Sequence, residues 1–213
     1  MPIQLPYFRY IFIGLQCTSL FGVGPFFGDP PDMNHPWAVH DRNRPQPIYV
    51  VAGLTNSSPP SDALVLFDGT TDSLHNWRHE KDEDTRKSDW IIQDGSLFCT
   101  PGAGNLTSIA TFGDCQIHLE WRSHALENKS GQSRGNSGIF LMDLIEVQIL
   151  DNFENITYAD GSAGSIYGVM PPAVNALKAP GNWQSYDVIF RRPIFKLGKL
   201  YDPGSITVLC NGV

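Results

Sequence analysis

The sequence predicts an all-β protein, an antiparallel β-sandwich. Three observations carry this prediction. Between residue 63 and the end of the chain, short apolar stretches are separated by turns rich in Gly and Pro, a pattern typical of sandwiches. No helical period lasts longer than two turns, and no internal repeat occurs. The length of 213 residues, of which 41% are hydrophobic, suits one domain plus an extension.

The composition of the first 62 residues predicts that they form an extension separate from the domain. They hold 10 of the 16 prolines and show no strand or helix period. Residues 1–24 resemble a signal peptide or other leader, since Arg9 precedes an apolar run, although no clear cleavage site follows. We expect a proline-rich extended arm over residues 25–62 and the domain over residues 63–213.

The first half of the domain predicts a series of short strands. Asp68-Gly69 and Asp94-Gly95 are turn signals, and the second of them lies at the tip of an expected hairpin. The strands expected here are Ala63–Phe67, Trp90–Ile92, Ser96–Cys99 and Ser108–Phe112.

Cys115 to Arg122 shows the clearest strand alternation in the chain. Ile117, Leu119 and Trp121 fall on one face, and His118, Glu120 and Arg122 fall on the other. The polar row could form a sugar site. Alternatively, it is a ladder of salt bridges on a solvated sheet.

The stretch from Arg134 to Asn152 is the centre of the predicted site. It opens with the polar turn Gly135 to Gly138 and continues into a long apolar segment. Glu146 and Gln148 interrupt that segment at a spacing of two, which places them on one face of a strand with apolar packing behind them. The alternative is the solvated face of an ordinary amphipathic strand.

Two more strands are expected, Trp183–Arg191 and Ser205–Cys210. After them, Asn211-Gly212 is a strong hairpin signal, but no returning strand follows in the sequence. We therefore expect a domain truncated at its C-terminus, with an open sheet edge.

Composition narrows the class of partner. The net charge of −7 and the lack of a Lys/Arg cluster argue against nucleic acid, and no apolar run is long enough to span a membrane. Sequons at Asn56, Asn105, Asn128 and Asn155 favour a secreted or extracytoplasmic glycoprotein.

No metal or cofactor is predicted with certainty. Asp82, Glu83 and Asp84 could hold a divalent cation, but the interleaved Lys and Arg favour a solvated loop. The four cysteines lack zinc-site spacing. Cys99 and Cys115 could form a disulfide or remain buried thiols.

Several motifs together resemble the 3-keto-disaccharide hydrolase family, in the same order along about residues 63–213. They are Leu66-Phe67-Asp68-Gly69, Trp77, Trp90 with Asp94-Gly95-Ser96-Leu97, Phe112 with Leu119-Glu120-Trp121-Arg122, Gly135-Asn136-Ser137-Gly138, Glu146-Val147-Gln148-Ile149-Leu150-Asp151, Gly164-Ser165-Ile166-Tyr167-Gly168 and Trp183-Gln184-Ser185-Tyr186-Asp187. The resemblance implies a concanavalin-like jelly roll acting on glycosides oxidised at C3, as a 3-keto-glucoside 1,2-lyase and 3-keto-glucal hydratase.

The residues favour elimination over ordinary glycoside hydrolysis. Ordinary glycosidases need two carboxyl groups about 5–9.5 Å apart. Gln148 cannot serve as one, and Asp151 would lie roughly 16 Å from Glu146 on the opposite face of a regular strand unless a bulge turned it. A C3 carbonyl acidifies the C2 proton, so a single base is enough to start an elimination.

The predicted roles follow from that chemistry. Glu146 is the general base, Gln148 and Asn136 orient sugar hydroxyls, and Arg122 or His118 stabilises oxyanion charge. The further substrate-binding candidates are Glu120, Asp151, Tyr167 and Trp183. Tyr167 and Trp183 could stack on the sugar or serve as core aromatics.

Two other functions stay open at the level of sequence. The first is a carbohydrate-binding module without catalysis, and the second is an inactive domain on the same fold. A binding module would tolerate Glu146→Gln, whereas an enzyme would not.

Overall fold

The computed structural model describes residues 28–55, 57–80, 89–124 and 128–213. The chain divides into two compact units, residues 1–51 and 52–213. The described part of the first unit contains neither helix nor strand. The fold and the candidate site belong to the second unit.

The described residues of the second unit form short strands and three 3₁₀ helices. Among the described residues no α-helix occurs. In chain order the elements are η1 (Asp72–Asn76), β1 (Trp77–His79), β2 (Ile91–Gln93), β3 (Ser96–Phe98), β4 (Leu106–Ser108), β5 (Cys115–Trp121), η2 (Gly131–Ser133), β6 (Ser137–Leu141), β7 (Ile145–Ile149), η3 (Ala159–Gly161), β8 (Gln184–Arg191), β9 (Ile194–Lys196), β10 (Lys199–Asp202) and β11 (Ser205–Cys210).

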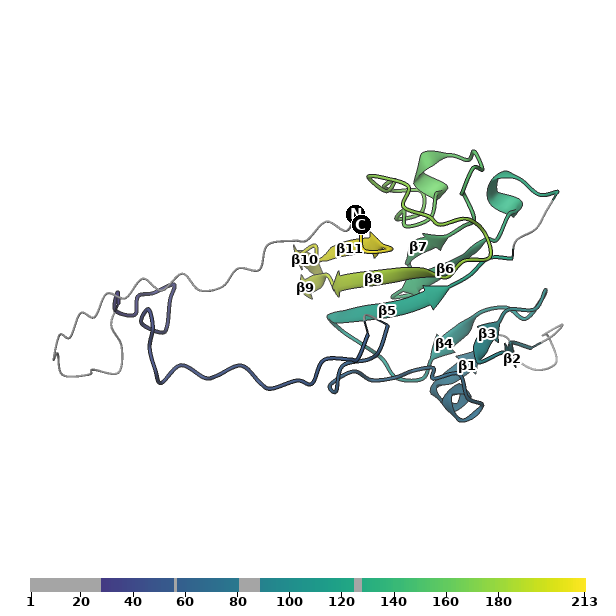
Figure 1. The fold of residues 1–213 in the computed structure, drawn as a ribbon. Coiled ribbons are helices and arrows are strands. Elements are labelled where there is room, and N and C mark those ends of the chain that lie inside the picture. The colour runs from purple at the N-terminus through teal and green to yellow at the C-terminus, as the bar shows by residue number, and fades with distance from the viewer. Residues whose placement is uncertain (1–27, 56, 81–88, 125–127) are drawn as a thin grey trace, which may run out of the picture. The chain divides into compact units, whose positions relative to one another are not determined.

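One layer of the core is an antiparallel three-stranded sheet with the order β11-β8-β5 (Figure 1). Its register places Leu119, Tyr186 and Cys210 side by side, so that alternate residues of all three strands share one apolar face. Tyr186 and Val188 on this face are 0% and 1% exposed. The opposite face of β5 carries His118 and Glu120, as the alternation predicts.

The second layer is the antiparallel β6–β7 hairpin (Figure 1). Its Ile139 and Val147 pack into the same core as the inner face of the three-stranded sheet. The Tyr186 hydroxyl donates a hydrogen bond of 2.8 Å to the Gln148 carbonyl, which ties β8 to β7 through the core. Burial raises the pKa of Tyr186, so the phenol stays a donor. The outer faces of the two layers therefore point away from each other.

An irregular segment around Ile166 pairs with β7 and so extends the hairpin on that side. Ile166 forms an antiparallel bridge with Val147. Next to that bridge, the Tyr167 amide donates to the Glu146 carbonyl, and the Gln148 amide donates to the Ser165 carbonyl. This pairing puts residues 165 and 167 beside the outer face of β7.

The structure confirms most of the predicted strands. β2–β3 is the predicted hairpin, with Asp94 and Gly95 both at positive φ (51° and 69°) as a tight primed turn requires. β5, β8 and β11 lie within the predicted ranges. The short strands β1, β9 and β10 were not predicted.

Two predicted strands are wrong. Ala63–Phe67 is irregular, because the Leu66 carbonyl accepts from the side chains of Asn76 and Trp77 rather than from a strand. The strand expected over Ser108–Phe112 lies earlier in the chain, as β4, because Leu106 to Ser108 pair with β1.

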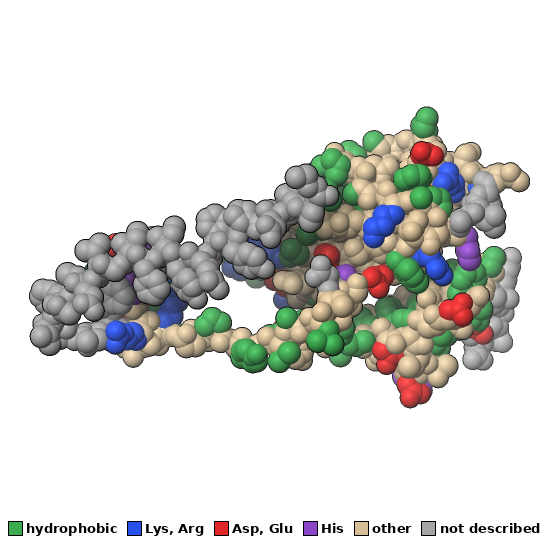
Figure 2. Space-filling view, in the orientation of Figure 1, with side chains coloured by type: hydrophobic (Ala, Val, Ile, Leu, Met, Phe, Trp, Pro, Cys, Tyr) green, Lys and Arg blue, Asp and Glu red, His purple; other side chains and the backbone are tan. Residues whose placement is uncertain are grey.

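The all-β antiparallel class is confirmed, whereas the strand order alone does not establish a jelly roll. Within the described ranges, no helix is long and apolar enough to cross a membrane. The described cysteines Cys99, Cys115 and Cys210 are free thiols, so the possible Cys99–Cys115 disulfide is absent. On the coloured surface of the strand-rich unit in Figure 2, acidic, basic and apolar side chains all occur.

Candidate functional site

The outer face of the β6–β7 hairpin brings the central predicted residues together. The register pairs Phe140 with Glu146, and the backbone contact between Glu146 and Tyr167 places Tyr167 on the other side. Glu146 is thus flanked by two aromatic residues, which are 51% and 39% exposed. In the adjacent row, Gln148 lies between Gly138 and Ser165.

The Glu146 carboxylate is partly buried and available. Among the described residues, no hydrogen bond or ion pair holds its oxygens. Burial raises the pKa of the Glu146 carboxyl, because desolvation penalises the charged form. The side chain lies over Gly138, where a β-carbon would clash with the carboxylate oxygen. The absence of a side chain at residue 138 therefore makes room for this acid.

A chain of side-chain amides holds the row of residues next to Glu146, the row that contains Gln148. The Gln148 Nε2 donates 3.0 Å to the Gln132 Oε1, and the Asn136 Nδ2 donates to the same oxygen at 3.1 Å. The Gln132 Nε2 in turn donates to the Thr157 hydroxyl and to the Gly161 carbonyl. Gln148 is only 1% exposed, so it holds Gln132 from the buried side. Gln132 in turn holds Asn136, which is exposed.

Two tyrosine hydroxyls meet beside Glu146. The Tyr158 and Tyr167 hydroxyl oxygens lie 2.6 Å apart, and the rings meet edge to face. The pKa of Tyr158 is raised to about 12, first by the hydrogen bond with Tyr167 and also by the charges of Asp160 and Glu146. Both the carboxylate of Glu146 and that of Asp160 therefore lie within electrostatic reach of this phenol.

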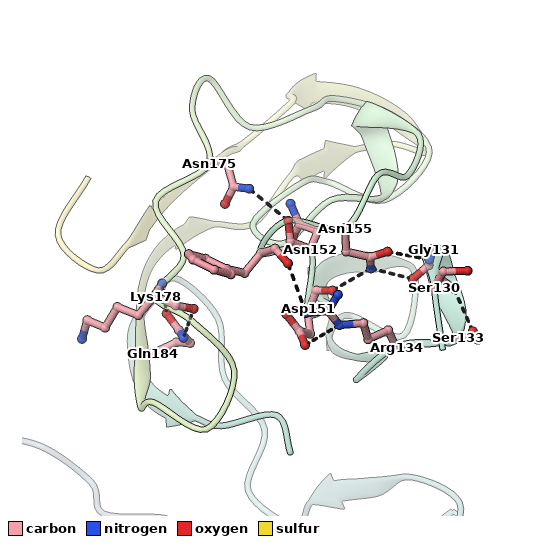
Figure 3. Close-up of polar contacts among 11 residues, drawn as sticks. Ser130, Gly131, Ser133, Arg134, Asp151, Asn152, Asn155, Asn175, Lys178 and Gln184 are labelled. Carbon is pink, nitrogen blue, oxygen red and sulfur yellow. Dashed lines mark hydrogen bonds and ion pairs between the residues drawn. The ribbon is translucent and has the colours of Figure 1, made fainter. Parts of the chain in front are cut away.

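Asp151 has a structural position (Figure 3). It is 2% exposed, and its Oδ2 accepts 2.8 Å from the Arg134 Nε. The Arg134 Nη2 also donates to the Phe153 carbonyl, while the Asn155 side chain bonds Gly131 and the Asp151 carbonyl. This network holds the loop before β6 against the chain after β7, and a sugar could reach Asp151 only if the network opened.

The remaining predicted residues lie on the outer face of the three-stranded sheet. The His118 Nδ1 and the Asp187 Oδ1 are 2.7 Å apart, and the Ser57 hydroxyl donates 2.8 Å to the Glu120 Oε1. The Arg122 guanidinium lies over the Trp183 ring, 4.8 Å from its centroid. Because the apolar core lies between the two outer faces, the structure does not bring His118, Glu120, Arg122 or Trp183 to Glu146.

No group of three or more His, Cys, Asp or Glu side chains suited to a metal ion occurs among the described residues. The candidate cation ligands Asp82, Glu83 and Asp84 lie outside the described residues.

Sequence reasoning did not identify four residues on the face that carries Glu146. Gln132 lies in the short helix η2 and Tyr158 just before η3, segments with no periodic pattern in sequence. Phe140 reads as one more apolar residue of a strand. Asp160 is a single acid in a polar turn. Only the cross-strand pairing of Phe140 with Glu146 was accessible from the sequence, through the hairpin register.

The face can support proton abstraction from a polar substrate. It offers one partly buried carboxylate without a fixed partner among the described residues, two hydroxyl groups, an exposed amide and flanking aromatic rings. A carboxylate of this kind is a stronger base than an exposed one, and aromatic rings next to it can pack on the apolar face of a sugar.

Comparison with known proteins identifies a matching family and a similar crystal structure. Residues 62–213 match the model of the 3-keto-alpha-glucoside-1,2-lyase-like domain. A crystal structure of a "putative glycosyl hydrolase" from Parabacteroides distasonis is 36% identical, with a TM-score of 0.73 over 86% of this chain and 78% of that one.

A second structure of the same description and organism is 17% identical, with a TM-score of 0.49 over 70% of this chain and 68% of that one. That likeness is too weak to support an inference. No curated protein matches the chain.

Proposed function

Because the chain belongs to the 3-keto-alpha-glucoside-1,2-lyase-like family, we propose that it is a carbohydrate-active enzyme that cleaves 3-keto-glycosides by elimination across C1–C2 and subsequent hydration. The observation that carries the proposal is the Glu146 carboxylate. It combines a pKa raised by burial with a position between Phe140 and Tyr167. Its oxygens accept no hydrogen bond from the described residues, so they are available to accept a proton from the substrate.

The first step is a proton transfer. A Glu146 oxygen removes the C2 proton of the 3-keto sugar, and the C2–H electron pair moves toward C3, so that the ketone becomes an enolate. Hydrogen-bond donors near the C3 oxygen stabilise this charge. The Tyr158–Tyr167 pair supplies one such donor on the same face as Glu146, because one O–H of the pair is used in their mutual hydrogen bond. The raised pKa of Tyr158 is consistent with a phenol that keeps its proton.

The second step breaks the glycosidic bond. The enolate re-forms the C3 carbonyl, a C1–C2 double bond forms, and the C1–O bond breaks with its electron pair leaving on the aglycone oxygen. That oxygen takes up a proton, which Glu146 now carries. Water then adds hydroxide to C1 and a proton to C2, so the sum of the steps is hydrolysis without a glycosyl-enzyme.

The positions of the other residues decide their roles in this proposal. Gln148, nearly fully buried, orients Gln132 and Asn136, and Asn136 contacts a sugar hydroxyl. Asp151 fixes the loop before β6 through Arg134. The oxyanion role first expected of His118 or Arg122 passes to the tyrosine pair, because His118 and Arg122 lie on the other outer face.

Two finer statements belong to the same proposal. The concanavalin-like jelly roll is the architecture that the family membership supports, with β6–β7 and β5–β8–β11 as parts of its two layers. A secreted or extracytoplasmic location is proposed from the sequons. Asn155 is a poor glycosylation site among them, since its amide is used in three hydrogen bonds.

The test is turnover of a 3-keto-disaccharide by the full chain, by Glu146→Gln and by the control Glu154→Gln, whose acid is exposed and lies outside this face. Loss of a general base lowers kcat by about 10²–10⁴-fold. We expect that loss in Glu146→Gln alone. Full activity in Glu146→Gln would overturn the proposal. Absence of wild-type turnover with sugar binding intact in all three proteins would instead establish a non-catalytic binding module.

A further inference from the structure

The outer face of the β11-β8-β5 sheet contains a hollow that the proposed reaction does not use. Its volume is about 250 Å³, and its lining includes His118, Glu120, Lys178, Trp183, Ser185 and Asp187. The register explains the cluster, because His118 is paired with Asp187 and Glu120 with Ser185 across β5 and β8. Four polar side chains from two strands thus share one patch.

The polar groups are held in place but keep bonding capacity. The Glu120 Oε1 accepts from Ser57, and the Asp187 Oδ1 contacts the His118 Nδ1. Within the described part of the chain, the second oxygen of each carboxylate and the His118 Nε2 have no hydrogen bond. These atoms can accept from, or donate to, adjacent hydroxyl groups of a ligand.

Trp183 supplies an aromatic surface at the edge of the hollow. It is 41% exposed, although large aromatic side chains are buried on average. The Arg122 guanidinium packs over one face of the ring and leaves the other face for a ligand, while the Lys178 Nζ donates to the Trp183 backbone carbonyl. An indole held in this way can pack against the apolar face of a sugar ring without a large loss of side-chain freedom.

Charge and size narrow the ligand. The lining combines the carboxylates of Glu120 and Asp187 with the ammonium of Lys178, so it disfavours an anion. Its polar side chains suit the hydroxyl groups of a neutral sugar. The volume of about 250 Å³ lies below the roughly 300–1,000 Å³ of pockets for drug-sized ligands. One ring fits such a hollow better than an oligosaccharide does.

We propose that this hollow is a second carbohydrate-binding site, which takes a single neutral pyranose ring stacked on Trp183 and hydrogen-bonded to Glu120 and Asp187. The site is non-catalytic and separate from Glu146, on the opposite outer face of the domain. Its function is to hold the protein on a saccharide, such as a non-reducing end or a branch, while the other face acts on its substrate. The proposal does not depend on the reaction assigned to Glu146.

The experiment is a titration of the full chain with methyl β-D-glucopyranoside, with glucuronate as the anionic probe and glucosamine as the cationic probe. Binding is measured by ligand-observed saturation-transfer NMR. In parallel, the indole N–H resonance of Trp183 is followed in ¹⁵N-labelled protein. The variants are Trp183→Ala, the isosteric Glu120→Gln, Glu146→Gln, and Gln116→Ala as a control, since Gln116 is exposed on the same face of β5 and lies outside the hollow.

We expect saturable binding of the neutral glucoside and a shift of the Trp183 resonance. Trp183→Ala and Glu120→Gln each weaken binding at least about tenfold, the effect of losing one stacking or charged hydrogen-bond partner. Gln116→Ala and Glu146→Gln bind as the wild type does, which separates this site from the catalytic proposal. Glu120→Gln keeps the side-chain volume and therefore tests the site even where Trp183→Ala alters folding.

Three results would overturn the second site. The first is the absence of saturation with all three probes. The second is binding of the glucoside that neither Trp183→Ala nor Glu120→Gln weakens. The third is tighter binding of glucuronate or glucosamine than of the neutral glucoside.

Discussion

Two acid–base pairs show how similar side chains are held in different ways, one beside the β6–β7 hairpin and one on the outer face of the three-stranded sheet. Arg134 and Asp151 approach to 2.8 Å, with side chains 18% and 2% exposed. His118 and Asp187 approach to 2.7 Å, with side chains 37% and 48% exposed. The distances are nearly equal, but only the first pair is removed from water. Bond length therefore says little about what such a pair contributes, and burial decides it.

The same contrast separates the two glutamates. Glu120 on the three-stranded sheet accepts a hydrogen bond from Ser57 and lies in an open hollow. Glu146 on the hairpin is partly buried, has no such partner among the described residues, and has a raised pKa. Partial burial without a partner makes a carboxylate more basic. This is the reason for assigning proton abstraction to the hairpin face and binding alone to the sheet face.

The largest expected stability difference lies between the Arg134–Asp151 and His118–Asp187 pairs. Asp151→Ala leaves the Arg134 guanidinium without its partner in a buried network, which costs about 3–5 kcal/mol of unfolding free energy. Asp187→Ala breaks an exposed pair and costs about 0–1 kcal/mol. Urea denaturation of both variants measures the difference. Equal losses in the two variants would contradict the contrast between the buried and the exposed pair.

Gly138→Ala tests whether Glu146 needs its position. A β-carbon at residue 138 would clash with the Glu146 carboxylate, and the flexible end of that side chain can move aside without unfolding the strand. A shift of about 1 Å at a catalytic group costs on the order of 100-fold in rate. We expect that loss in kcat with little change in the melting temperature. Ser137→Ala, the matched control on the same strand, should retain activity, and an unchanged kcat in Gly138→Ala would separate Glu146 from the chemistry.

Tyr158→Phe is a smaller perturbation of the hairpin face. It removes the 2.6 Å hydroxyl contact with Tyr167, and loss of one hydrogen bond costs about 1 kcal/mol, or roughly fivefold in rate. The reduction should appear in kcat, because the hydroxyl pair acts on charge that develops in the transition state. Tyr201→Phe is the control, since Tyr201 is exposed and contacts Lys196 away from this face. A larger effect from the control would contradict the role of the pair.

The smallest effect is a dependence of stability on pH. Folding raises the pKa of Glu146, so the folded state favours the protonated form, and ionisation at higher pH costs stability. Glu146→Gln should therefore unfold at a slightly higher temperature than the wild type at neutral pH. The gap should narrow as the pH falls through the raised pKa. The acid limb of wild-type kcat/KM should lie above the ordinary pKa of a glutamate, and a Glu146→Gln variant less stable than the wild type at pH 7 would contradict this assignment.

The sequence predicted the parts of the fold that a period of two determines. The alternation from Ile117 to Trp121 assigned the faces of β5 correctly, and Asp94-Gly95 placed a hairpin. Ala63–Phe67 failed because an apolar run does not reveal whether a neighbouring strand exists to receive its hydrogen bonds. There, the side chains of Asn76 and Trp77 supply them instead.

The sequence singled out individual residues for the candidate site, but it did not show which of them lie together. Glu146 was singled out because the polar interruption of an apolar strand is visible in sequence, and Asn136 because it lies in the polar turn before that strand. Which sheet face a residue shares with another strand is not visible, so His118 and Arg122 were grouped with Glu146 although the core separates them. Loop contacts such as that of Gln132 with Gln148 depend on tertiary structure alone.

The most direct test of the account is the fate of the C2 hydrogen. A 3-keto-glucoside deuterated at C2 is turned over by the wild type and by Glu146→Gln in ordinary water, and the deuterium left at C2 of the product is measured by mass spectrometry against an enzyme-free control. Elimination by Glu146 predicts loss of the deuterium in the wild-type product and washout slowed by about 10²–10⁴-fold in the variant. Product that retains its C2 deuterium, or washout at the wild-type rate in Glu146→Gln, would contradict it.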